Sequence, residues 1–318
     1  MDFQPDGSHQ AISRLAGEVL DGSAGDPDKA WAALGQTGLL TLAVPERLGG
    51  AGLGVLETTL VLTEIGRRAL DLPALGHLVA ILTGAHEPGR TFGIAVAEPG
   101  DPLPAAPRTT VTGGTVTGVK TGVTAADRLL VTVAGPAVVT IDLAGPGATL
   151  DRGILRLDRA AAHPLGDDKT HQDLHRYAVS CACALGDGAL AGALALTAEH
   201  VRTRRQFGRP LATFQAVAQQ IADVYIASHT LHLATLAAAW RLGTGRDADD
   251  DLHVAAQWLT AEAPPAARTC HHLHGGLGLA IDYPLHRHTT LIRDLVRFLG
   301  GAEHRLTTLG ERLVHRPD

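Results

Sequence analysis

The sequence predicts a mainly α-helical protein with a small β-domain in the middle of the chain. Two patterns carry this prediction. In the first and last parts of the chain, apolar residues recur at intervals of three and four residues, which is the period of an amphipathic helix. Between about Phe92 and Leu165, short β-branched runs alternate with glycine and proline at the spacing of antiparallel hairpins. We therefore predict an N-terminal helical domain at 1–90, an antiparallel β-domain at 91–168 and a helical region at 169–318.

Two helices are predicted in the N-terminal region. The first has an apolar stripe whose members lie three or four residues apart: Ile12, Leu15, Ala16 and Val19. The second covers 53–70, where leucines and an isoleucine share one face and Glu57 and Glu64 lie on the other. In the middle region, four short runs predict strands, namely 109–111, 115–119, 129–133 and 138–143.

The C-terminal region returns to the helical period. An apolar stripe from Phe214 to Leu231 predicts one long helix, and Pro210 and Thr213 lie where such a helix would begin. Residues 243–251 form a polar loop. Pro264 and Pro265 must break or kink the next helix, because proline lacks the N–H donor and clashes with the preceding turn.

Composition restricts the kinds of function that are open to the chain. Hydrophobic residues make up 45% and charged residues 19%, and the net charge is −6. These values indicate a globular protein without the basic surface that nucleic acid requires. We expect no membrane span and no signal peptide, because no apolar run reaches the necessary length and Met1 leads straight into polar sequence. The three cysteines fit a reducing cytoplasm, and Cys181 and Cys183 suggest buried packing rather than metal binding.

Several separated segments resemble signature sequences of the acyl-CoA dehydrogenase family, and they occur in the family's order. The segment that starts at Arg204 reads RRQFGRP and is followed by Phe214-Gln215, which is similar to the family pattern R-x-Q-F-G-x-P…F-Q. The segment that starts at His274 reads HGGLG and is followed by Asp282-Tyr283-Pro284, which resembles H-G-G-x-G…E-Y-P. Further matches are 40–64, 98–100 (EPG) and 118–120 (GVK).

This resemblance implies a helical N-terminal domain, a middle β-domain and a C-terminal four-helix bundle. It also implies an FAD cofactor and the α,β-dehydrogenation of a CoA thioester. In the family, one subunit holds the flavin ring and its neighbour contacts the ADP end of FAD. Carried over by position, the ADP contacts of this chain are Arg204, Gln206, Phe207, Gln215, His272, Gly275 and Gly276. A guanidinium suits the pyrophosphate, and glycines let the backbone approach it. Taken singly, an arginine here also suits a solvated helix end, and a glycine pair suits a turn.

The family's catalytic glutamate has no counterpart in this chain. Its two usual positions, counted from Asp282 and from Phe207, hold Leu299 and Ala178, and neither side chain can accept a proton. The family loop T-E-P-G-x-G-S-D, which contacts flavin and acyl-CoA, is reduced at 97–103 and has lost both its threonine and its G-S-D. The chain thus keeps what a subunit gives to its neighbour and loses what it needs for its own site.

We therefore predict a non-catalytic or half-site subunit of a heteromeric acyl-CoA dehydrogenase, most simply α2β2. A larger acyl-CoA dehydrogenase subunit would supply the glutamate and most of the acyl pocket, and an electron-transfer flavoprotein or a similar protein would accept the electrons. The short, alanine-rich chain resembles subunits of actinobacterial steroid-degrading acyl-CoA dehydrogenases, which implies a steroid-derived thioester. Two alternatives are a self-sufficient enzyme with Asp282, His286 or Glu303 as an unusual base, and a non-enzymatic scaffold.

Two other motifs have competing interpretations. Residues 186–192 (GDGALAG) follow an apolar run and resemble a G-x-G-x-x-x-G nucleotide loop. Because no βαβ alternation surrounds them, we favour close packing of helices at these glycines. The histidines between 271 and 288 lack the helical pair with a supporting carboxylate that is typical of zinc sites, so we predict no metal.

Overall fold

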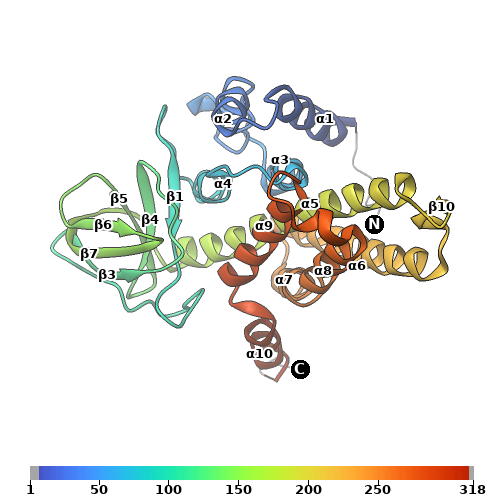
Figure 1. Ribbon diagram of the computed structural model, residues 1–318. Coiled ribbons are helices and arrows are strands. Elements are labelled where there is room, and N and C mark those ends of the chain that lie inside the picture. The colour runs from blue at the N-terminus through green and yellow to red at the C-terminus, as the bar shows by residue number, and fades with distance from the viewer. Residues whose placement is uncertain (1–6, 315–318) are drawn as a thin grey trace.

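The computed structural model describes residues 7–314, so the first residues of the chain, on which the expectation about a signal peptide partly rests, lie outside it. Helices come first, then strands, then helices (Figure 1). The N-terminal elements are α1 (Gly7–Gly22), α2 (Pro27–Gln36), the 3-10 turn η1 (Glu46–Leu48), α3 (Val55–Arg68) and α4 (Ala74–Leu82). Local chemistry sets their ends: the Asp26 carboxylate accepts from two N–H groups at the start of α2, and Pro27 occupies its first turn.

The middle domain consists of two four-stranded sheets around a small core of their own. Their orders are β1-β4-β5-β8 and β2-β3-β7-β6. The strands are β1 (Phe92–Ala95), β2 (Thr110–Thr112), β3 (Thr115–Lys120), β4 (Arg128–Val133), β5 (Ala137–Asp142), β6 (Ala148–Asp151), β7 (Ile154–Ala161) and β8 (His163–Gly166). All pairs in these sheets are antiparallel except β1 with β4. This parallel pair corrects the prediction of a purely antiparallel domain. It forms because the chain crosses through the other sheet between β1 and β4, and such a crossover is what parallel pairing needs.

The C-terminal region is a helical bundle built around one 36-residue helix, α5 (Asp168–Thr203). The remaining elements are β9 (Arg205–Gln206), β10 (Arg209–Pro210), η2 (Leu211–Thr213), α6 (Gln215–Gly243), α7 (Asp249–Ala261), α8 (Ala263–His274), η3 (Gly275–Leu279), α9 (Leu285–Phe298) and α10 (Gly301–Val314). The fold therefore confirms the predicted class, with helices on both sides of a small β-domain. Figure 1 shows α5 running from the β-domain to the β9–β10 hairpin.

Close packing explains the glycines of α5. A Cβ at Gly188 would lie 2.0 Å from the Thr63 carbonyl oxygen, and one at Gly192 would lie 2.3 Å from that of Arg67. These glycines therefore let α5 and α3 approach each other, as the helix-packing interpretation predicted. The nucleotide-loop alternative is wrong, because residues 186–192 lie inside an uninterrupted helix. Cys181 and Cys183 of the same helix are fully buried, as expected.

The helix α5 corrects one premise of the expectation about membrane spans, namely that no apolar stretch is long enough. By length and composition it is apolar enough to cross a membrane, and 78% of its most apolar window is buried inside the fold. The central helix of a bundle meets the same criteria, because neighbouring helices cover its faces.

The predicted boundaries after α5 need one adjustment. The helix expected near Pro210 and Thr213 begins at Gln215, because Phe214 has an extended backbone and the residues before it form the separate turn η2. The break expected at Pro264 is confirmed: α7 ends at Ala261, and α8 carries the two prolines in its first turn, where no N–H donor is needed.

Candidate cofactor-binding site

The Q-F-G segment forms a tight hairpin at one end of the bundle. Gln206 pairs with Arg209, so the turn consists of Phe207 and Gly208. Both turn residues have positive φ, 51° and 77°, as the mirror-image turns of two-residue hairpins require. Phe207 is 92% exposed. A bulky aromatic residue that is both exposed and held in the left-handed region indicates a contact with another molecule, since its own fold gains little from it.

Arg204 connects this hairpin to the H-G-G segment. Its backbone N–H donates to the His200 carbonyl at 2.8 Å. The His200 ring stacks on the His274 ring, with centroids 4.4 Å apart. The end of α5 and the end of α8 therefore lie side by side, and Arg204 and Gly275 follow at the same end of the bundle. Within the described part of the chain, no hydrogen bond or ion pair holds the exposed guanidinium of Arg204.

His274 is fixed by partners on both ring nitrogens. Its Nδ1 lies 2.8 Å from the Cys270 carbonyl oxygen, and its Nε2 lies 2.9 Å from the Tyr283 hydroxyl. Burial lowers the pKa of His274, so the ring is neutral near pH 7. The two partners assign the tautomer: Nδ1–H donates to the carbonyl, and Nε2 accepts from the hydroxyl. Tyr283 of the D-Y-P segment thereby holds the start of the glycine turn in place.

The two glycines after His274 have different reasons for being glycine. Gly275 adopts φ 60° and ψ −139°, a conformation that side chains disfavour. Gly276 has no positive φ, and a Cβ there would meet no atom of the chain within 4 Å. The fold itself therefore does not require glycine at 276, whereas close approach of a ligand to the backbone does. The open backbone and the unpaired Arg204 guanidinium fit the ADP end of FAD.

The remaining predicted contacts are exposed in the same part of the bundle. Gln215 is the first residue of α6, and His272 lies in the last turn of α8. Between the hairpin and Gln215, the Phe214 ring meets the Phe207 ring edge to face at 6.2 Å. It also lies under the Arg209 guanidinium at 4.0 Å. These two contacts, which the sequence analysis did not foresee, brace the hairpin against the start of α6.

The two positions of the family's glutamate are buried in aliphatic surroundings. Ala178 in α5 and Leu299 at the end of α9 are both 0% exposed. The Leu299 carbonyl accepts a hydrogen bond from Arg305 Nε at 2.5 Å. Of the residues considered as substitute bases, Asp282 and Glu303 are exposed. His286 is half-buried, and its Nδ1 lies 2.7 Å from the Tyr283 carbonyl oxygen.

The E-P-G and G-V-K segments have a structural role in this chain. Glu98 is 3% exposed, and its Oε1 lies 2.9 Å from Nζ of the fully buried Lys120. Lys120 also donates to the Thr132 hydroxyl at 2.9 Å. Burial alone would raise the pKa of Glu98, but hydrogen bonds from Arg108, Lys120 and Thr109 outweigh it and lower the pKa to about 2. Glu98 and Lys120, one from each segment, therefore form an internal ion pair that stabilises the β-domain.

The order of domains, helices on both sides of a small β-domain, is that of an acyl-CoA dehydrogenase fold. The chain belongs to the acyl-CoA dehydrogenase family: the family's N-terminal domain profile matches residues 11–87 and its C-terminal domain profile matches residues 171–314. FAD is accordingly the cofactor. Within the described residues, no group of three or more histidine, cysteine, aspartate or glutamate side chains is arranged to hold a metal ion.

Similar proteins cover the whole chain. The acyl-CoA dehydrogenase FadE28 of Mycobacterium tuberculosis is 40% identical over 98% of this chain and 99% of its own length. FadE27 of the same organism is 32% identical over 90% and 88%. The ChsE4–ChsE5 complex of M. tuberculosis contains a chain with a TM-score of 0.87 and 29% identity, covering 100% of both chains. A variant of the Tcur3481–Tcur3483 steroid acyl-CoA dehydrogenase gives a TM-score of 0.90 and 29% identity, covering 96% and 98%.

Proposed function

We propose that this chain is the half-site subunit of a heteromeric, cytoplasmic FAD-dependent acyl-CoA dehydrogenase. It contributes the ADP-binding half of the FAD site, while a larger partner subunit supplies the catalytic glutamate, the flavin pocket and most of the acyl pocket. One contrast carries the proposal. The residues that a subunit gives to its neighbour's FAD are exposed together at one end of the bundle. The positions for its own base hold Ala178 and Leu299, both fully buried.

An apolar surface around the cofactor residues supports a partner subunit. Phe207 is 92% exposed, and Leu279 and Ile281, which follow the paired glycines, are 81% and 83% exposed. Tyr225 and Ile226 on α6 are 56% and 58% exposed. Large apolar side chains that gather at a surface are typical of protein interfaces. Phe207 and Leu279 follow Arg204 and Gly276 by three residues each, which is where a partner that shares FAD would have to dock.

The similar structures favour the same arrangement. ChsE4–ChsE5 is a complex of two different chains, and Tcur3481–Tcur3483 is a steroid acyl-CoA dehydrogenase that also carries two chain names. By analogy, we propose an α2β2 assembly that acts on a steroid-derived CoA thioester. Fold-level similarity does not determine a substrate, so a panel of thioesters offered to the assembled complex has to decide this point.

The proposal is tested by measuring the FAD affinity of the complex with single arginines removed. Replacing Arg204 by alanine removes the guanidinium assigned to the pyrophosphate, and a lost hydrogen bond to a charged group corresponds to about a tenfold to hundredfold weaker affinity. Arg202→Ala is the matched control, because Arg202 is an exposed arginine near the end of the same helix and pairs with Glu199. We expect Arg204→Ala alone to weaken FAD binding.

Two results would contradict the proposal in different ways. Unchanged FAD affinity in the Arg204→Ala complex would favour the scaffold alternative. Dehydrogenation of an acyl-CoA by the isolated chain would favour a self-sufficient enzyme, and Asp282, His286 and Glu303 would then be replaced one at a time to find the base.

A further inference from the structure

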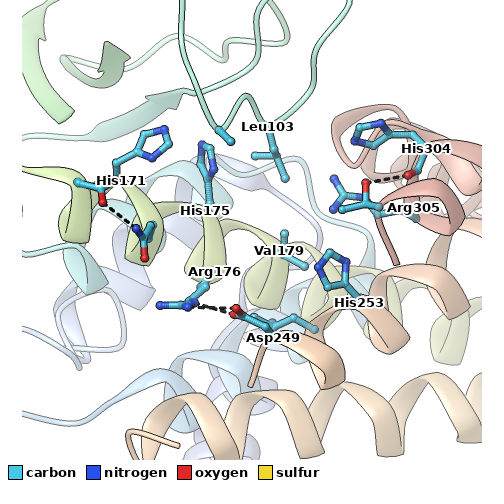
Figure 2. Close-up of a pocket in the computed structure, with 14 residues that line it drawn as sticks. Leu103, His171, His175, Arg176, Val179, Asp249, His253, His304 and Arg305 are labelled. Carbon is cyan, nitrogen blue, oxygen red and sulfur yellow. Dashed lines mark hydrogen bonds and ion pairs between the residues drawn. The ribbon is translucent and has the colours of Figure 1, made fainter. Parts of the chain in front are cut away.

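A cavity of about 420 Å³ lies between the first half of α5, α7, α10 and the loop after β1. Figure 2 shows Leu103 of the loop, His175 and Val179 of α5, His253 of α7 and Arg305 of α10 around this cavity. It adjoins both vacated glutamate positions: Val179 follows Ala178, and Arg305 binds the Leu299 carbonyl. It is far along α5 from Arg204, so it is separate from the cofactor-binding residues.

Arg305 is the unusual residue in this cavity. Its side chain is buried, with only 4% exposed, yet its guanidinium forms no ion pair with any carboxylate among residues 7–314. Nε donates to the Leu299 carbonyl at 2.5 Å, whereas the buried Nη2 has no hydrogen-bond partner. Burial lowers the pKa of Arg305 to about 10, so it stays charged at neutral pH. A buried charge without a counter-ion is costly, and proteins normally pair it.

The carboxylates that line the cavity are engaged elsewhere. Asp249 receives two hydrogen bonds from Arg176, at 2.7 Å and 3.1 Å. Asp168 lies at the exposed rim and accepts from Gln172 Nε2 at 2.9 Å. With Arg176 neutralised by Asp249, one guanidinium charge inside the cavity remains without compensation.

Two histidines on one face of α5 add hydrogen-bonding capacity. His171 and His175 are one turn apart, with ring centroids 4.3 Å from each other. The Nε2 atoms of both rings are buried and have no hydrogen-bond partner. Burial lowers the pKa of His171, and it lowers that of His175 to about 3. Both rings are therefore neutral near pH 7. His171 donates its ring N–H to the Pro104 carbonyl, so its open Nε2 is an acceptor, whereas the His175 ring can present an N–H donor to an anion.

We propose that this cavity binds a monoanionic carboxylate with a short aliphatic body. The guanidinium of Arg305 pairs with the carboxylate, and the imidazole of His175 offers a further donor. Leu103, Val179 and Leu252 pack against the aliphatic part. A single guanidinium charge matches a monoanion, whereas a phosphate dianion would bring a second, uncompensated negative charge into a buried site. The site uses only this chain's residues and does not depend on the FAD role.

Calorimetric titration of the full chain, alone and in its complex, tests the proposal with hexanoate as the probe. Hexanamide, which has the same shape without the charge, and inorganic phosphate are the comparison ligands, all at one ionic strength. We expect one hexanoate to bind per chain and to raise the thermal midpoint, and we expect neither comparison ligand to do so. A cavity of this volume is large enough for such a small ligand.

Variants assign the binding to the cavity. Arg305→Met should weaken hexanoate binding at least about tenfold, because a charged hydrogen bond is lost. The matched control is Arg297→Met, which removes an exposed arginine at the end of α9 that pairs with Asp294. If Arg305→Met does not fold, Leu103→Trp decides the question, because it fills the cavity from a surface loop and leaves the guanidinium in place. No hexanoate binding, binding of phosphate instead, or undiminished binding in Leu103→Trp would each overturn the proposal.

Discussion

The buried ion pair between Glu98 and Lys120 allows a prediction whose size follows from the structure. Lys120→Met keeps most of the side-chain volume but removes a fully buried cation beside a carboxylate that is 3% exposed. Breaking a buried pair by removing one partner costs about 3–5 kcal/mol. Glu98 keeps its hydrogen bonds from the Arg108 and Thr109 N–H groups, both at 2.9 Å, and from the Thr109 hydroxyl at 2.7 Å. It also keeps an ion pair with the exposed Arg108 guanidinium, whose Nε lies 3.2 Å from Oε2. We therefore expect the lower end of the range, about 3 kcal/mol.

Calorimetry of the full chain or its complex measures this loss as a fall in the melting temperature of about 4–5 °C. The control is Lys29→Met, which removes an exposed lysine that pairs with Asp26 at 3.4 Å and should change stability by less than about 1 kcal/mol. Adding Glu98→Gln to Lys120→Met should recover part of the loss, because the buried carboxylate that Lys120 neutralised is then uncharged. A Lys120→Met protein as stable as the Lys29→Met control would refute the reasoning.

Three further predictions follow from the site and the core. Gly276→Ala should weaken FAD binding by the complex without changing the melting temperature, because a Cβ there meets no atom of the chain; equal affinity would contradict the assigned contact. Ala178→Glu should destabilise the chain by several kcal/mol without giving it dehydrogenase activity, since the position is fully buried; an active isolated variant would count against this. Burial lowers the pKa of His77 and His288 to about 4 and of His175 to about 3. The unfolded chain therefore binds more protons below about pH 6.5, and stability should fall by roughly 1.4 kcal/mol per histidine for each pH unit down to about pH 4. A melting temperature that is flat between pH 6.5 and 4.5 would contradict it.

The periodic parts of the fold could be predicted from the sequence. Helical spacing identified the helices on both sides of the β-domain, and the prolines at 264 and 265 marked the break before α8. The parallel pairing of β1 with β4 could not be predicted, because it depends on how the chain crosses between two sheets. The length of α5 was also missed: its many glycines look like interruptions until α3 packs against them.

The candidate site was predictable as separate segments but not as an arrangement. Motif spacing predicted Arg204 and Gly276 as contacts. The stacking of His200 on His274, which brings the ends of α5 and α8 together, could not be predicted because these two residues are far apart in the chain. The cavity around Arg305 gave no signal in the sequence. From sequence, an arginine in an amphipathic helix is expected at the surface. Arg305 is buried because α10 packs against α7 and α9.

The central claim is that this chain provides half of one FAD site and has no complete site of its own. The most direct test is the ratio of FAD to protein in the purified complex with the partner subunit, measured from flavin absorbance and subunit quantification. We predict one FAD for each pair of unlike subunits, and none retained by this chain when it is purified alone. Two FAD molecules per pair, or tightly bound FAD in the isolated chain, would contradict the claim.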